Sequence, residues 1–518
     1  MAHSKQLKHR IPVKLRHNWK LLALCVAFLA ACWGVFGSGT IRPYVTTARA
    51  AEADTVTTNL TGTKNLFDAS VAHEVQLTFT DQAYEDMLTA YFKEGEKKYV
   101  EADLTIDGTR IPSVGVRLKG NSTLAGLTWR GQSKQRAMTG GGQRPEGLPE
   151  GFRPPGIEQR GNGGPPGGGM MRSALKAEEP ENLPWLISFD EFVEGRRYQN
   201  HSQVAVRPAA TGSTTMLNEA LGIALVGASG EPTQRSAYSS FTVNGRSSSP
   251  RLVVEYLDEG YAEGLGDGVL YKSLATGSFT YKGEDQTEYT TDFKQINKVG
   301  GKDLQPVIEL VKWVNEASGT EFAEGLAHRL DVQSFARYLA LQHIMANFDD
   351  MAGPGKNYYL WYDSGTGKFK VITWDLNLAL NGDATSGVND TITMGGFGRG
   401  RPQQDQQQGR PPEGFTPPDG GEQGRPGGGG MMRMGHPLKE KFLQNATFKK
   451  LYEEQYRALY TNLLADGTAS GLLDDLVAAY KLNERADTAK ADAEAKTLRT
   501  FLRTRIETLR SDKAITGA

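Results

Sequence analysis

Cysteine is nearly absent from this chain. The two cysteines, Cys25 and Cys32, both lie in an apolar stretch near the N-terminus. A protein that loses this stretch contains no thiol, which excludes disulfides and cysteine-based metal sites. An excess of one charge sign is missing as well, because the formal net charge is -1. Nucleic-acid binding requires a basic surface, so we expect no nucleic-acid partner.

The first 50 residues have the composition of an export signal. Basic residues precede the apolar run Leu21–Phe36, and Ala48-Arg49-Ala50 supplies a small-x-small cleavage site. We predict that residues 1–50 are a signal peptide or a membrane anchor. Lipidation at Cys32, which closes a Leu-Ala-Ala-Cys box, is an alternative. Each reading places the protein outside the cytoplasm, either secreted or attached to the outer face of a bacterial membrane.

Two segments, residues 138–180 and 395–436, are crowded with Gly, Pro, Gln and Arg. Such sequences bury too little apolar surface to offset the entropy lost on ordering, so we predict two disordered insertions. They share related motifs, GGGMMR in the first and GGGGMMR in the second. They are either flexible surface loops or segments that contact a substrate or the cell wall.

The remaining sequence divides into a β-rich part and a helical part. Alternating apolar residues predict strands within residues 67–300, and apolar residues at helical spacing predict helices within residues 301–515. We therefore predict an α+β fold. Residues 51–66 form a linker, residues 67–300 the β-rich N-terminal part, and residues 301–515 the catalytic and helical C-terminal part.

Residues 347–381 carry the strongest candidate for chemistry. A predicted helix, with Asp331 as its N-cap, ends at an Asn-Phe-Asp-Asp corner, and two predicted strands then flank the hairpin signal SGTGK. This arrangement can bring Asp349 or Asp350 close to Asp375. Phosphoryl transfer needs one carboxylate to orient a hydroxyl, and an Asn with a second carboxylate to hold Mg²⁺.

Two other interpretations of this segment are open. The acids at the corner could belong to a solvated turn, although carboxylates at a helix C-terminus oppose the helix dipole, which favours a chemical role. A calcium site built from Asp375, Asn377, Asn381 and Asp383 is the second interpretation, but its spacing does not fit the EF-hand pattern.

Four further charged residues are candidates for nucleotide binding. Arg117 and Lys119 are two residues apart on a predicted strand, so they point to the same side and could contact phosphates. Glu255 ends an apolar strand, and Lys272 is its candidate partner in a Lys–Glu pair that positions nucleotide phosphates. The structural alternatives are a solvated strand face for the first two residues and a simple ion pair for the others.

Several motifs follow one another in a fixed order: VRLKGNST, LISFDEFVEGRRYQ, FTVNG, VVEYLDEGY, LYK, NYYL and WDLN. In this order they resemble the spore-coat CotH-type family of secreted, atypical protein kinases. The resemblance implies a two-lobed, kinase-like fold with ATP and Mg²⁺ or Mn²⁺ as cofactors. It implies that Asp349 orients and deprotonates a substrate hydroxyl, with Asp350 as the alternative. It also implies that Asp375 binds the metal and that Asn357 is a further metal ligand.

The function implied by the resemblance is transfer of the ATP γ-phosphate to Ser or Thr of an extracytoplasmic protein. A transfer that activates a carboxylate would use the same metal site. Ser188 stands where relatives often carry a lysine, and Asn377 stands where an acid is common. These two departures support the alternative of a catalytically inert, kinase-like adhesin or envelope-assembly module, whereas Asp349, Asn357 and Asp375 support catalysis.

Overall fold

The computed structural model describes residues 56–121, 123–133, 175–208, 213–299, 303–392 and 435–517, with a few helical residues between 20 and 28. The chain divides into two units, Met1–Ala51 and Glu52–Ala518. The predicted leader lies almost entirely outside the described residues and stays a prediction. Within the parts of the chain listed above, no helix is long and apolar enough to cross a membrane.

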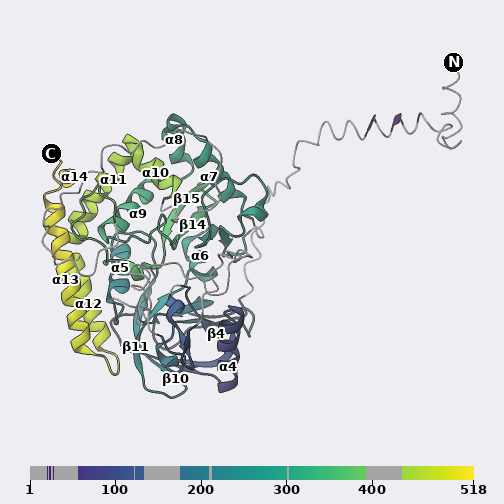
Figure 1. Ribbon diagram of the computed structural model, residues 1–518, viewed down its shortest axis with the longest axis vertical. Coiled ribbons are helices and arrows are strands. Elements are labelled where there is room, and N and C mark those ends of the chain that lie inside the picture. The colour runs from purple at the N-terminus through teal and green to yellow at the C-terminus, as the bar shows by residue number, and fades with distance from the viewer. Residues whose placement is uncertain are drawn as a thin grey trace, which may run out of the picture. The chain divides into compact units, whose positions relative to one another are not determined.

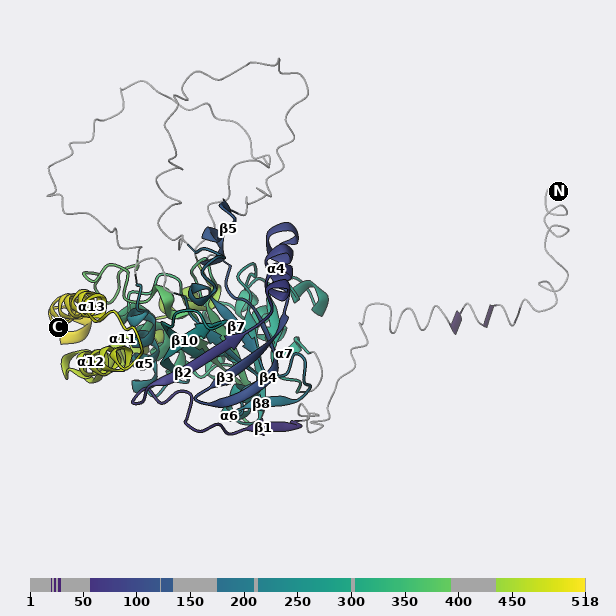
Figure 2. The same cartoon turned by 90° about the horizontal axis from the view of Figure 1, so that it is seen from below.

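The second unit has the predicted α+β fold class. Seven of its strands close into a barrel in the order β10-β11-β9-β7-β4-β3-β2. Strands β2 and β10 pair in parallel, and the other pairs are antiparallel. Figure 2 shows β2, β3, β4 and β7 side by side. The barrel strands are β2 (His73–Thr78), β3 (Val100–Ile106), β4 (Thr109–Leu118), β7 (Trp185–Ser188), β9 (Gln203–Val206), β10 (Ser236–Val243) and β11 (Ser249–Glu255).

The barrel core follows from alternation along its strands. In β2, Val75 and Leu77 point inward while their neighbours are exposed, as a period of two residues requires. Helix α4 (Asp81–Thr89) begins after Thr80, whose side chain caps it. Leu175 and Ala177, inside the predicted insertion 138–180, are buried in this core, so this end of the predicted insertion belongs to the fold. Residues 138–174 lie outside the described residues.

Short strand pairs accompany the barrel. β1 (Thr58–Leu60) pairs in parallel with β8 (Arg196–Tyr198), and β5 (Thr128–Trp129) pairs with β6 (Gln132–Ser133). A separate antiparallel sheet has the order β13-β12-β14-β15. Its strands are β12 (Gly268–Ser273), β13 (Phe293–Gln295), β14 (Tyr358–Asp363) and β15 (Lys368–Thr373).

α9 (Val332–Ile344) packs against β15, and α6 (Glu259–Leu265) packs against β12. Figure 1 shows the barrel strands β4, β10 and β11 at one end of the unit, and β14 and β15 with most of the helices at the other. The helices are α5 (Leu217–Ala228), α6 (Glu259–Leu265), α7 (Gln305–Glu316), α8 (Gly319–Gly325), α9 (Val332–Ile344), α10 (Pro437–Gln444), α11 (Ala446–Leu459), α12 (Thr468–Lys481), α13 (Thr488–Arg510) and α14 (Lys513–Thr516).

The C-terminal helices are part of the main core. α12 and α13 run side by side along one edge of the unit, and α5 packs against both (Figure 1). His436, which falls at the end of the predicted insertion 395–436, is buried, with its Nε2 3.1 Å from the hydroxyl of Tyr358. His436 therefore belongs to the folded core, and residues 395–434 lie outside the described part of the chain.

Candidate functional site

The acidic corner Asn347–Asp350 is built at the C-terminal end of α9. This helix begins after Asp331, whose carboxylate caps the first turn as predicted. The chain leaves the helix through Ala346, which has φ 46°. Asn347 then donates from Nδ2 to Gln342 Oε1 at 2.8 Å and accepts from the backbone N–H of Asp349 at 3.3 Å. The Asn of the corner therefore fixes the backbone that presents Asp349.

The Asp349 carboxylate is buried and hydrogen-bonded on both oxygens. Oδ1 accepts from the backbone N–H of Gly355 at 2.6 Å, and Oδ2 accepts from Asn357 Nδ2 at 3.0 Å. Burial raises the pKa of Asp349 to about 6, the negative charges of Asp375 and Asp350 add to this rise, and the two hydrogen bonds oppose it. A fixed carboxylate with a pKa in this range is suited to accept a proton near neutral pH.

Asp350 has a different environment. Its Oδ2 lies 2.5 Å from Lys439 Nζ on α10, and its Oδ1 accepts from the backbone N–H of Ala352 at 2.8 Å. A cation therefore holds the Asp350 carboxylate, whereas neutral donors hold that of Asp349. The geometry therefore favours Asp349 for the proton-accepting role and gives Asp350 a structural one.

The predicted hairpin places Asp375 beside this corner. β14 and β15 pair antiparallel with Tyr358 opposite Thr373, so continuing the register sets Asn357 opposite Trp374. Asp375 follows with φ 55°, a backbone conformation that turns the chain sharply after the strand. Asn357 also donates to the backbone carbonyl of Asp349 at 3.1 Å. The structure thus connects Asn357 directly to Asp349, and its predicted place in the metal shell stays a prediction.

Asp375 is surrounded by positive charge. Arg207 Nη2 lies 2.5 Å from Asp375 Oδ1, and Arg207 Nε lies 2.8 Å from Glu219 Oε2. Burial raises the pKa of Asp375, but the charges of Arg207, Lys119 and Lys272 outweigh it and hold this pKa below its ordinary value. Asp375 is therefore ionised at neutral pH, and its side chain is 28% exposed, so it remains open to a ligand.

Sequence reasoning did not identify Arg207 and Glu219. Arg207 directly follows β9, and Glu219 is the third residue of α5. Their side chains are only 9% and 2% exposed. A cation at the end of an apolar strand, followed by an acid in the first turn of the next helix, is a pattern that could have suggested the pair.

Lys119 and Lys272 lie against one aromatic surface. Lys272 Nζ is 4.9 Å from the ring centre of Trp374 and 5.5 Å from those of Tyr256 and Tyr359. Lys119 Nζ is 5.3 Å from the ring centre of Trp374. Burial and the nearby charge of Arg207 lower the pKa of Lys119 to about 7. Both predicted cations therefore belong to the surroundings of Asp375.

Arg117 lies in a different environment from Lys119. Its guanidinium lies 5.0 Å from the ring centre of Tyr99, and its charge opposes the burial effect that raises the pKa of Glu191. Arg117 and Lys119 were predicted to act together as phosphate contacts, but they lie in different places. Lys119 is beside Trp374, and Arg117 is over Tyr99. The alternation along β4 was correct, but β4 ends at Leu118 and Lys119 already belongs to the following turn.

Ser188 and the two arginines that follow it, Arg196 and Arg197, make contacts of their own. Ser188 donates to Asp190 Oδ1 at 2.6 Å. Arg196 donates to the backbone carbonyls of Phe189, Pro112 and Ser113. Arg197 pairs with Glu263 at 2.6 Å. The cations around Asp375 come instead from Arg207, Lys119 and Lys272.

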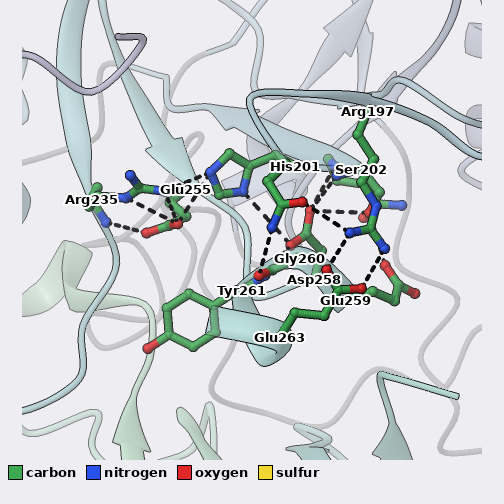
Figure 3. Close-up of polar contacts among 12 residues, drawn as sticks. Arg197, His201, Ser202, Arg235, Glu255, Asp258, Glu259, Gly260, Tyr261 and Glu263 are labelled. Carbon is green, nitrogen blue, oxygen red and sulfur yellow. Dashed lines mark hydrogen bonds and ion pairs between the residues drawn. The ribbon is translucent and has the colours of Figure 1, made fainter. Parts of the chain in front are cut away.

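Glu255 does not pair with Lys272 as predicted. Its carboxylate lies 2.7 Å from Arg235 Nη2 and 3.4 Å from His201 Nε2, and it also accepts from the backbone N–H of Arg235 at 2.8 Å. Figure 3 shows Glu255 between these two side chains. Lys272 donates instead to the hydroxyl of Tyr256 at 3.4 Å. The predicted Glu255–Lys272 pair does not form, because Glu255 ends a barrel strand whereas Lys272 lies in the second sheet.

The Glu255 contacts belong to a polar network at the connection between the barrel and the second sheet (Figure 3). Asp258 Oδ2 accepts from the backbone N–H of Ser202 at 2.7 Å, and its Oδ1 accepts from that of Tyr261 at 2.9 Å. Arg197 reaches Glu263 on α6. Because buried charges are stable only when paired, this network fixes how the segment after β11 meets the barrel.

Gly260 lies at the closest approach within this connection. A Cβ at this position would lie 1.8 Å from the carbonyl oxygen of Asn200, whereas a Cβ at Gly264 of the same helix has no neighbour within 4 Å. Gly260→Ala is therefore expected to lower the free energy of unfolding by about 1–3 kcal/mol or more. Gly264→Ala should be neutral or slightly stabilising. Chemical denaturation of both variants checks this, and equal stabilities would contradict the predicted clash.

A buried arginine supports the end of α9. Arg505, on α13, donates to the backbone carbonyls of Ile344 at 3.2 Å and His343 at 3.0 Å, and to the hydroxyl of Tyr456 at 2.7 Å. The last carbonyls of a helix lack intrahelical partners and carry partial negative charge. Arg505 supplies these carbonyls with both hydrogen-bond donors and a positive charge, immediately before the acidic corner. Burial and the charge of Arg505 lower the pKa of His343 to about 4.

A cavity of about 450 Å³ adjoins Asp350. It lies between α9, α10 and the segment Val388–Ile392, and its polar lining includes Lys439 and His436. Among the residues that the structure describes, no group of three or more His, Cys, Asp or Glu side chains could hold a metal ion. A metal at Asp375 would therefore need oxygen ligands from other sources, such as substrate phosphates.

The chain was compared with known protein families and with curated proteins. The family model described as CotH kinase protein matches residues 157–509, which is more than half of the chain. A comparison with curated proteins gave no match. The matched region includes Asp349, Asp375, Arg207 and Glu219, whereas Lys119 precedes it. The chain belongs to the CotH kinase protein family.

Proposed function

We propose that this chain is a secreted or surface-attached kinase that transfers the γ-phosphate of ATP to Ser or Thr of an extracytoplasmic protein. The observation that carries the proposal is the set of charges around Asp375. The ionised carboxylate of Asp375 is surrounded by Arg207, Lys119 and Lys272. The buried acid Asp349 lies close enough for the charge of Asp375 to raise its pKa. The family to which the chain belongs supports the same reading.

The residues around Asp375 fit a metal-bound polyphosphate. Mg²⁺ is usually held by one or two carboxylates together with substrate phosphates, and Asp375 supplies such a carboxylate. Arg207, Lys119 and Lys272 supply the positive charge that nucleotide phosphates require. Bound Mg²⁺ or Mn²⁺ would neutralise charge on the transferred phosphoryl group. Asp375 and, by family resemblance, Asn357 are the residues proposed to hold it.

The protein groups then have separate tasks. Asp349 accepts the proton of the acceptor hydroxyl, and Gly355 and Asn357 hold its carboxylate in one orientation. Glu219 holds Arg207, as the Glu of kinases holds the phosphate-binding lysine. The barrel and the helical part would correspond to the two lobes of a kinase-like fold. The cavity beside Asp350 is the proposed place for acceptor side chains that flank the hydroxyl.

The second candidate is a catalytically inert surface or envelope-assembly module. One observation favours it: Asp375 is already paired with Arg207, so an incoming metal must compete with a buried guanidinium. Glu219 offers Arg207 a second partner at 2.8 Å, so the guanidinium remains paired if Asp375 turns to a metal. The kinase proposal therefore accounts for both carboxylates, whereas the inert module leaves the exposed part of Asp375 without a role.

Phosphoryl transfer tests the proposal directly. The purified chain is incubated with γ-labelled ATP and Mg²⁺ or Mn²⁺, with and without a generic Ser/Thr acceptor. We expect label transfer by the wild type and a loss of at least about 10²-fold in Asp375→Ala, because charge stabilisation at the phosphoryl group is removed. Asp383→Ala, at an exposed acid eight residues later, is the matched control and should retain activity.

Two outcomes would count against this assignment. If the wild type transfers no label and ATP causes no thermal shift, the inert module becomes the better account. If Asp383→Ala loses activity together with Asp375→Ala, the metal site extends along the segment from Asp375 to Asp383, as in the calcium interpretation.

A further inference from the structure

Glu494 on α13 accepts hydrogen bonds from three consecutive residues. Its Oε1 accepts from Thr214 N at 2.7 Å and Thr214 Oγ1 at 2.5 Å. Its Oε2 accepts from Ser213 Oγ at 2.9 Å, Thr215 Oγ1 at 2.7 Å and Thr215 N at 3.3 Å. Burial raises the pKa of Glu494, but these donors outweigh it and hold the pKa below its ordinary value. The carboxylate is therefore ionised and holds this segment in place.

Residues 213–215 lead directly into α5. The residue before this helix, Met216, has φ 58° and supplies no side-chain cap. The start of α5 consequently depends on contacts from outside the helix. Glu494 holds the segment immediately before the helix, and Tyr238 donates a hydrogen bond to the carbonyl of Thr215 at 2.9 Å. Negative charge near the N-terminus of a helix is also electrostatically favourable.

The first turn of α5 contacts the Asp375 segment in two ways. Asn218 Nδ2 donates to the backbone carbonyls of Asn377 at 2.7 Å and Ala379 at 3.2 Å. The next residue, Glu219, holds Arg207, which in turn reaches Asp375. A displacement of the start of α5 would therefore move both the backbone after Asp375 and the guanidinium beside it.

We propose that Glu494 is a positioning residue for the phosphoryl-transfer site. It acts through residues 213–215 and the first turn of α5 on Arg207 and Asp375. The inference rests on the proposed kinase function. It gives α13 a role that could not be predicted from the charged sequence of this helix. Because α13 also carries Arg505 at the end of α9, this one helix supports both the Asp375 side and the Asp349 side of the site.

The test compares Glu494→Gln with Glu507→Gln, an exposed glutamate of the same helix. Glutamine keeps one acceptor oxygen but turns an NH₂ group toward hydrogen-bond donors. Amide hydrogen exchange of the full chain should become faster in residues 213–222 and 374–380 of Glu494→Gln, and should be unchanged in Glu507→Gln. This readout does not require kinase activity.

Kinetics then separate positioning from general stability. At a temperature where circular dichroism shows both variants folded, Glu494→Gln should lower kcat by about tenfold to a hundredfold, the size expected for a small misplacement of catalytic groups. KM for the acceptor should stay unchanged, because the cavity beside Asp350 is not part of this path. Ser213→Ala, which removes one donor, should show a smaller loss of kcat.

The outcomes distinguish this inference from the function on which it rests. An active wild type with unchanged exchange and unchanged kcat in Glu494→Gln overturns the positioning role and leaves the kinase function intact. Faster exchange with unchanged kcat also overturns it, because the movement of α5 would then be catalytically silent. A wild type without phosphoryl transfer overturns the proposed function itself, and this inference with it.

Discussion

Asp349→Asn is expected to lower kcat by about 10²–10⁴-fold, the range that a positioned general base contributes. Asparagine keeps the size of the side chain but cannot accept a proton. The wild type should lose activity as pH falls through about 6, because the pKa of Asp349 is raised to about 6 and only the ionised form is a base. Initial rates across pH 5 to 8 measure both effects.

Asp350→Asn is the matched control for this experiment. The carboxylate of Asp350 is paired with Lys439, so removing its charge should lower stability more than it lowers kcat. The fall of activity at acidic pH should remain in this variant. If Asp350→Asn abolished transfer while Asp349→Asn retained it, the two neighbouring acids would have to exchange roles.

The ionisation of Asp349 should also change the free energy of unfolding. Activity should rise with pH through this ionisation, whereas stability should fall. A raised pKa means that the folded state binds the proton of Asp349 more tightly than the unfolded state, whose value lies near 3.8. Between pH 4 and 6 the folded state therefore holds more protons, and its stability falls as pH rises. The contribution is about 3 kcal/mol, from roughly two pKa units at 1.36 kcal/mol each. Asp349→Asn should lack this part of the pH dependence of unfolding.

Much of the acidic corner could be predicted from the sequence because its signals are local. The cap at Asp331, the corner at Asn347 and the two-stranded hairpin lie within one short stretch of chain, and each depends on neighbouring residues. Asp349 and Asp375 are brought together by this local unit alone. The same reasoning gave the alternation of the barrel strands.

The contacts that surround Asp375 could not be predicted in the same way. Arg207 reaches Asp375 across 168 residues, and Glu494 reaches Thr214 across 280. Nothing in composition or periodicity states which strand end faces which loop. The Glu255 prediction failed for this reason, since a lysine in the second sheet and an arginine beside the barrel are equally plausible partners until the strand order is known.

Arg207→Met is expected to have the second large effect, on both stability and activity. The variant leaves Glu219 buried without its partner and takes a cation from Asp375. Removing one member of a buried ion pair costs about 3–5 kcal/mol. Nucleotide affinity and kcat should fall together, because the guanidinium is the proposed phosphate contact. Denaturation and ATP titration measure the two effects separately.

A double variant decides which effect belongs to which partner. In Arg207→Met/Glu219→Gln the buried charge that lacked a partner is also removed, so much of the lost stability should return. Activity should not return, because the phosphate contact is still missing. Recovery of both would make the pair purely structural and leave Lys119 and Lys272 as the phosphate ligands. Recovery of stability alone would show that the lost stability came from the unpaired charge of Glu219 and that activity needs the guanidinium of Arg207 itself.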